Sequence, residues 1–148
     1  SRVVLVPDAV LPETSALFDD LPDAPLHVFC RQDADEGAME RLENAGARVH
    51  PVPGDRAALD LAVVLQTCRE LGLRSILCEG GRALADGLLR GGHVHRFYLL
   101  VAPDTFGAGG VPAFAGDADQ LDWSSFVPVV EPLRFGRDTM IVLDREDA

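Results

Sequence analysis

The sequence contains no lysine, and all 13 of its basic residues are arginine. This absence excludes Schiff-base chemistry through a lysine and the phosphate-binding lysine of a P-loop. Basic residues are also few, since 24 acidic residues outnumber them and give a net charge of −11. Such a charge disfavours broad contact with nucleic-acid phosphates or anionic lipid. If the chain binds an anion, arginine side chains and backbone N–H groups must do so.

Cysteine is scarce as well, and Cys30, Cys68 and Cys78 show no short paired spacing. The lack of such a spacing disfavours a zinc site, and we expect three buried structural thiols in a reducing compartment. No apolar run approaches the length of a membrane span, and no basic-then-apolar leader opens the sequence. We therefore expect a cytoplasmic protein with no membrane or nucleic-acid partner and no metal.

What the sequence does contain is an alternation of strand-like and helix-like segments. With 148 residues, of which 47% are hydrophobic, it can form one domain over residues 1–148 with a real core. In the helical segment expected at 55–72, Asp55 is the expected N-cap and Gly72 the expected end. Apolar periodicity predicts strands at 2–6, 26–30, 47–52, 74–79 and 96–103, and helices at 35–46, 55–72 and 82–91. The strand at 96–103 is expected to be buried.

The last third of the sequence departs from this alternation. Residues 104–122 are rich in Gly, Asp and Ala and predict a long loop. Two strands, 126–135 and 138–143, follow and are joined around Gly136, which indicates an antiparallel hairpin. Trp123 is expected in the hairpin core or in a dimer contact. The predicted fold class is α/β, with a mixed, mostly parallel sheet, helices on both faces and a C-terminal antiparallel hairpin.

The stretch "SILCEGGRALADGLLRGG", residues 75–92, carries the chemistry. Gly80 and Gly81 stand where a predicted strand passes into a helix, so they either expose helix-start N–H groups to a phosphate or merely form a tight turn. Glu79 would end the strand at the carboxyl edge of the sheet, where ligands bind in open α/β folds. Its carboxylate can accept two hydrogen bonds from a nitrogen-rich heterocycle.

Together with "LLVAP", "FGAGG" and "FGRDTMIVL", this stretch resembles the bacterial riboflavin-biosynthesis reductases. These are the C-terminal domains of bifunctional deaminase–reductases and have the dihydrofolate-reductase-like fold. The resemblance covers most of the chain and is specific from residue 75 onward. It implies NADPH-dependent reduction of 5-amino-6-(5-phosphoribosylamino)uracil, ribosyl to ribityl, by a homodimer.

The same resemblance assigns roles to individual positions. It places Glu79 against the phosphoribosylamino-pyrimidine substrate. It assigns cofactor binding to the segment that follows, namely Gly80, Gly81, Arg82, Ala83, Leu84, Ala85, Asp86 and Gly87. A same-fold reductase of a pterin or another heterocycle, and a non-catalytic nucleotide-binding remnant, remain alternatives.

Three features depart from the family pattern or lie outside it. Pro7 stands where the family usually has a Ser or Thr near the cofactor, so that contact is lost or moved. Arg31 is then the best candidate for a 2′-phosphate ligand, with a solvated surface arginine as the alternative. We also expect that the family's N-terminal strand and substrate-binding segment are absent here. His93 and His95 form an H-x-H pair that is either a metal ligand pair or, as we expect, two surface histidines.

Overall fold

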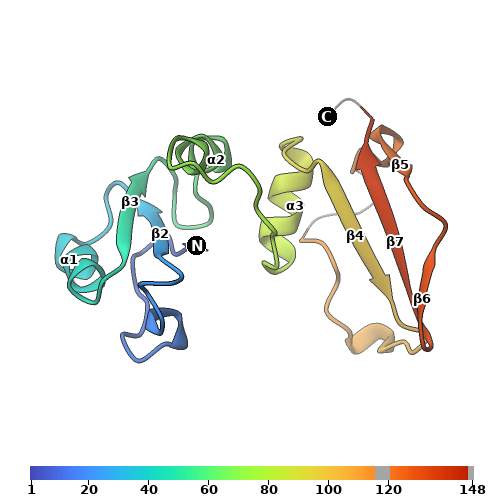
Figure 1. Ribbon diagram of the computed structural model, residues 1–148, viewed down its shortest axis with the longest axis horizontal. Coiled ribbons are helices and arrows are strands. Elements are labelled where there is room, and N and C mark those ends of the chain that lie inside the picture. The colour runs from blue at the N-terminus through green and yellow to red at the C-terminus, as the bar shows by residue number, and fades with distance from the viewer. Residues whose placement is uncertain (116–120, 147–148) are drawn as a thin grey trace. The chain divides into compact units, whose positions relative to one another are not determined.

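The computed structural model describes residues 1–115 and 121–146 and is shown in Figure 1. The chain divides into two compact units, residues 1–75 and residues 76–148. We call them the parallel unit and the antiparallel unit and describe each by itself. That the two form one domain stays a prediction. Part of the expected loop at 104–122, residues 116–120, lies outside the described residues.

The parallel unit contains a three-stranded parallel sheet in the order β1-β2-β3. The strands predicted at 2–6, 26–30 and 47–52 are therefore confirmed. Proline lacks a backbone donor, and Pro51 accordingly lies on β3, an edge strand of this sheet. The elements are β1 (Arg2–Leu5), the 3₁₀ turn η1 (Ala16–Phe18), β2 (Leu26–Arg31), α1 (Glu36–Asn44), β3 (Arg48–Val52) and α2 (Leu61–Glu70).

Each face of this sheet has its own apolar core, because successive strand residues point to opposite sides. On one face, Val28 and Cys30 of β2 pack in one cluster with Ala38 and Leu42 of α1. On the other face, a second cluster contains Phe29 of β2 together with β3 and α2 residues. This second cluster consists of Phe29, Val52, Leu59, Val64 and Cys68. Helices on both faces are thus confirmed for the parallel unit.

The start of α2 differs from the prediction. Asp60 is the N-cap, and its carboxylate accepts hydrogen bonds from the N–H groups of Ala62 and Val63 at 3.0 and 3.1 Å. Asp55 instead accepts from two N–H groups of its own turn, those of Ala57 and Ala58. Both aspartates are good caps by type. Only the backbone path, which places residues 55–60 in a loop, selects the second one.

The antiparallel unit has a sheet in which β7 pairs with β4, β5 and β6. The predicted hairpin is confirmed, since β6 and β7 pair antiparallel around Gly136, which has a φ of 64°. The single strand expected at 126–135 is wrong, because residues 129–132 interrupt it and leave two short strands, β5 and β6. Glycine adopts this left-handed conformation without strain. The elements are α3 (Arg82–Arg90), β4 (Arg96–Val101), the 3₁₀ turns η2 (Gly107–Gly109) and η4 (Trp123–Ser125), β5 (Phe126–Pro128), β6 (Leu133–Phe135) and β7 (Asp138–Arg145).

A cluster of half-buried aromatic side chains lies in the antiparallel unit. The Trp123 ring lies 5.8 Å from Phe97, 5.6 Å from Phe114 and 6.3 Å from Phe126, measured between centroids. These spacings suit the tilted and edge-on contacts that aromatic rings prefer. Arg145 adds a cation above the Phe126 ring, at 5.5 Å from its centroid. Trp123 is half-buried and packs against Phe97 of β4 and Phe126 of β5, and a dimer contact, the other alternative, stays a prediction.

Three expectations are wrong. Residues 74–79 form no strand, and Leu77 is 73% exposed. Cys78, in the same segment, is exposed, whereas Cys30 and Cys68 are buried as expected. The strand β4 is formed but is not buried, with Leu100 69% exposed. An apolar run becomes a strand only when a neighbouring strand supplies hydrogen bonds, and no strand among the described residues pairs with 74–79.

The α/β class is confirmed, with parallel strands first and an antiparallel hairpin at the end. The parallel and antiparallel strands form two sheets, one in each unit. Within the described ranges, no helix is both long and apolar enough to span a bilayer.

Candidate functional site

The N-terminus of α3 is the centre of the predicted cofactor segment. Gly81 is the N-cap, with φ −69° and ψ 179°, and no side chain caps the helix there. A Cβ atom built on Gly81 would meet no heavy atom within 4 Å, so the space at the cap is open. The first N–H groups of a helix have no partner within it, and the helix dipole makes this end attractive to anions. The geometry fits a phosphate group.

The neighbouring Gly80 has a different role. A Cβ atom on Gly80 would lie 2.5 Å from Cδ2 of Leu84, which packs back against the turn before the helix. The backbone of this turn is therefore closely covered by the side chain of Leu84. Gly80 allows that packing, whereas Gly81 leaves room for a ligand. The two glycines that the sequence presents as one pair thus do different things.

The predicted cofactor residues spread over more than the helix terminus. Residues 80–84 form the turn and the first helical turn, and Arg82 and Ala83 are exposed there. Residues 85–87 lie in the second turn and are half-buried. Asp86 is bound to Arg90 one turn later, with 2.8 Å between Oδ2 and Nε. A phosphate at the N-cap would contact residues 80–84 and not residues 85–87, because the effect of a helix end is confined to its first turn.

Glu79 precedes this turn in the extended segment that follows α2. Its side chain is exposed, and no hydrogen bond or ion pair of this carboxylate occurs among the described residues. A free carboxylate two residues before an open helix N-terminus can accept hydrogen bonds from a substrate amine or amide. Residues 74–79 form no strand, so Glu79 does not end a sheet strand as expected, and its role against a substrate stays a prediction.

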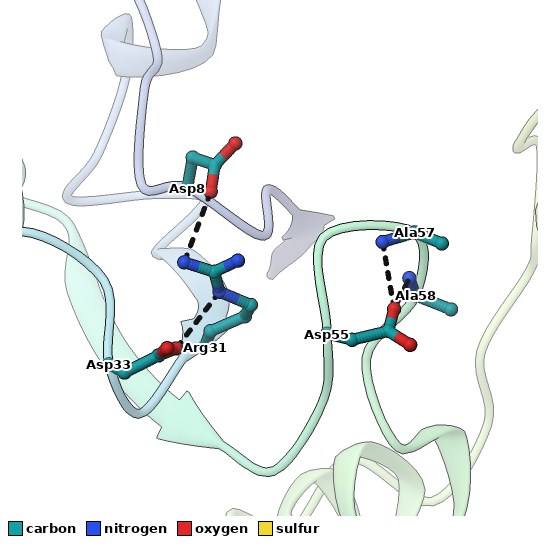
Figure 2. Close-up of polar contacts among 6 residues, drawn as sticks. All are labelled: Asp8, Arg31, Asp33, Asp55, Ala57 and Ala58. Carbon is teal, nitrogen blue, oxygen red and sulfur yellow. Dashed lines mark hydrogen bonds and ion pairs between the residues drawn. The ribbon is translucent and has the colours of Figure 1, made fainter.

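Arg31, the candidate 2′-phosphate ligand, is already occupied by acids (Figure 2). It ends β2, and its side chain is only 11% exposed. Nη2 lies 3.3 Å from Oδ1 of Asp8, and Nε lies 3.0 Å from Oδ1 of Asp33. The second contact is an ion pair by distance, although Nε has no aligned hydrogen bond. A guanidinium held by two carboxylates has little positive charge left for a phosphate.

Asp55 adds a third acid near this edge of the parallel sheet (Figure 2). The N–H groups of Ala58 and Ala57 hold the pKa of Asp55 below its usual value, and the Arg31 charge lowers it further. Sequence reasoning did not detect this group of charges around Arg31. The signal was available, because acids that follow parallel strands by one to three residues gather at the same edge of the sheet.

The H-x-H pair does not form part of a metal cluster in the described part of the chain. His95 is exposed and His93 is half-buried, just before β4. No group of three or more His, Cys, Asp or Glu residues with metal-binding geometry occurs among residues 1–115 and 121–146. The interpretation of the pair as two surface histidines stays a prediction.

Comparison with known proteins identifies the family. No curated protein matches the chain. Among solved structures, a pyrimidine reductase-like protein from Corynebacterium diphtheriae superposes with a TM-score of 0.75 at 20% identity, covering 97% of this chain and 60% of that one. RibD from Acinetobacter baumannii gives a TM-score of 0.76 at 19% identity, covering 97% of this chain and 37% of that one.

A third solved structure is a diaminohydroxyphosphoribosylaminopyrimidine deaminase/5-amino-6-(5-phosphoribosylamino)uracil reductase from Thermotoga maritima. It gives a TM-score of 0.68 at 17% identity, covering 97% of this chain and 37% of that one. The chain thus spans less than two thirds of each relative, and identities at this level establish a shared fold. The model of the RibD C-terminal domain matches residues 1–130. Since that match covers most of its 148 residues, the chain belongs to the RibD C-terminal domain family.

Proposed function

We propose that this chain is a reductase domain that uses NADPH to convert the ribosyl group of 5-amino-6-(5-phosphoribosylamino)uracil to a ribityl chain. It would act as a homodimer in the cytoplasm. Membership of the RibD C-terminal domain family supports the reductase class. The observation that carries the cofactor proposal is the open, uncapped N-terminus of α3 at Gly81.

Each part of the site has a defined task in this proposal. The backbone N–H groups of Arg82 and Ala83 would hold the cofactor pyrophosphate, aided by the dipole of α3. The N–H of Leu84, the third donor expected from the sequence, already donates to the Gly81 carbonyl at 3.1 Å. The Glu79 carboxylate would orient the pyrimidine by accepting hydrogen bonds from its amine and amide groups. The nicotinamide supplies the hydride when it is bound, so the chain needs no nucleophile and contributes binding, orientation and charge.

The homodimer proposal rests on the apolar surface of the antiparallel unit. Several side chains of its strands are more than two fifths exposed, namely Tyr98, Leu100, Val101, Leu133 and Phe135. Exposed apolar residues gathered on one sheet are typical of a protein–protein interface. Light scattering on the purified chain tests this, and a monomer at micromolar concentration would contradict it.

The cofactor proposal is tested by fluorescence titration with NADPH and NADH on the wild-type chain and on two Gly81 variants. Gly81→Asp and Gly81→Asn both fit the open cap, because aspartate and asparagine are preferred N-cap residues. They differ in charge. A carboxylate at the cap should repel the pyrophosphate by roughly 2 kcal/mol, which weakens binding about 30-fold.

We expect saturable binding by the wild-type chain with a preference for NADPH, a smaller loss in Gly81→Asn and the full loss in Gly81→Asp. Unfolding curves of both variants should match or slightly exceed the wild type, which separates loss of the site from loss of the fold. Equal affinity in the Asp and wild-type chains would contradict a phosphate site at α3. Binding without reduction of the pyrimidine would favour the nucleotide-binding remnant, and reduction of a pterin instead would favour the same-fold alternative.

A further inference from the structure

Two histidines of the parallel unit lie side by side on one face of the sheet. His27 is the second residue of β2 and His50 the third residue of β3. Phe29 is opposite His50 in the strand register, and Arg48 is opposite His27, so all four lie on the same face. Nδ1 of His27 lies 3.0 Å from Nε2 of His50, and the two rings are nearly parallel, with 16° between their planes and 5.2 Å between their centroids. We call these two residues the histidine pair.

The histidine pair is removed from water. His27 is 2% exposed and is the one polar or charged residue in the buried class within the described ranges. His50 is half-buried and stacks on Phe29, with 4.9 Å between ring centroids. Phe29 belongs to the apolar cluster that also includes α2 residues. A charge at His27 would therefore have to be accommodated in an apolar interior, which is costly.

The hydrogen bond between the two rings limits how many protons they can carry. A neutral imidazole has one N–H and one acceptor nitrogen, so one ring donates and the other accepts. One added proton on the outer nitrogen of the donor ring would keep this bond but would place a charge in the apolar interior, which opposes it. A second added proton places N–H against N–H at 3.0 Å and puts two like charges side by side.

The charged groups around the histidine pair also oppose protonation. Burial lowers the pKa of His27, and the charges of His50, Arg48 and the Ser1 amino group lower it further. Burial and then Arg48 lower the pKa of His50. From β1, the residue opposite His27 is Val3, which is apolar, and the α2 residues of this face are Val63, Val64 and Cys68. Among the described residues, the charged groups that lower these two pKa values are Arg48, the Ser1 amino group and, for His27, the charged form of His50, and all of them are cations.

We propose that the histidine pair is an acid-sensitive contact that keeps β2, β3 and their α2 face packed only while it is unprotonated. This goes beyond the proposed function, because neither histidine belongs to the proposed cofactor and substrate segment, residues 79–87. Both rings bind protons more weakly in the folded chain than in the unfolded chain, where the pKa of histidine is near 6.5. Stability is therefore complete above about pH 6.5 and is lost as the pH falls below it.

The sequence has four histidines, which provides a matched control. The pair variant is His27→Asn/His50→Gln, in which amide groups replace Nδ1 and Nε2 without a titratable proton. The control is His93→Asn/His95→Gln, which removes two histidines from the antiparallel unit. Urea unfolding of the full chain is followed by circular dichroism from about pH 7.5 to pH 5.5, a range in which histidine titrates and most carboxylates do not.

As the pH falls below about 6.5, we expect the unfolding constant of the wild type and of the control to rise by up to about 100-fold for each pH unit, which is the limit for two protons. The pair variant should lose most of this dependence. An equal pH dependence in the pair variant and the wild type would overturn the proposal. If the pair variant does not fold, NMR of the wild-type imidazole signals decides. The proposal requires two histidines to stay neutral until the chain unfolds, and it is overturned if all four titrate in the folded chain.

Discussion

Replacement of Arg31 tests whether this residue stabilises the sheet edge or binds the cofactor. Arg31 contacts Asp8 and Asp33, whose side chains are 59% and 79% exposed. Each partly exposed ion pair contributes about 0.2–1 kcal/mol. Loss of the guanidinium also leaves two carboxylates at one edge without their cation. We therefore expect Arg31→Ala to lower the free energy of unfolding by about 1–2 kcal/mol, a factor of roughly 5–30 in the unfolding constant.

Two assays distinguish the structural role from the ligand role. Urea unfolding measures stability, and parallel titrations with NADPH and NADH measure the preference for the 2′-phosphate. Because Arg31 is already paired with acids, we expect the ratio of the two affinities to stay the same in Arg31→Ala. Arg31→Lys is the control, since it keeps the charge but loses the planar fork, and should lose less stability than Arg31→Ala.

The reasoning would be refuted by the opposite pair of results. An Arg31→Ala chain of wild-type stability with at least tenfold weaker binding of NADPH relative to NADH would identify Arg31 as the 2′-phosphate ligand. The ion pairs with Asp8 and Asp33 would then be a resting arrangement that the cofactor displaces.

Two further predictions concern helix capping and acid stability. Asp60→Ala removes the cap of α2 and should lower the free energy of unfolding by about 1 kcal/mol, with some loss of helical circular dichroism. Asp55→Ala is the control and should leave the helical signal unchanged. An equal loss in both variants would contradict the assignment of the cap. Arg96 lowers the pKa of Asp144 through a bidentate contact of 2.6 Å, so this contact stabilises the fold above the ordinary aspartate pKa and is lost as the pH falls below it. Asp144→Asn should accordingly reduce the pH dependence of urea unfolding below about pH 4, and an unchanged dependence would show that the pair contributes nothing.

Local chemistry is enough to predict most of the elements of this chain. Apolar residues recur about every two residues in a strand and about every 3.6 in a helix. The segments around Val28 and Val142 form strands and the segment around Leu42 forms a helix, as their apolar patterns indicate. The hairpin at Gly136 is equally local, because a left-handed turn residue between two short apolar runs leaves few other conformations. The uncapped glycine turn before α3 could also be located from sequence, although its role in cofactor binding stays a prediction.

Contacts between distant residues decided everything else. Residues 74–79 have the composition of a buried strand, yet strand formation depends on a hydrogen-bonding neighbour that no local pattern reveals. The partners of Arg31 and the facing rings of His27 and His50 depend on the register between strands, since a shift of one residue would turn each side chain to the other face. The sequence by itself determined which segments become helices and strands. Only the tertiary structure decided which charges meet, because pairing across strands joins residues that are far apart in the chain.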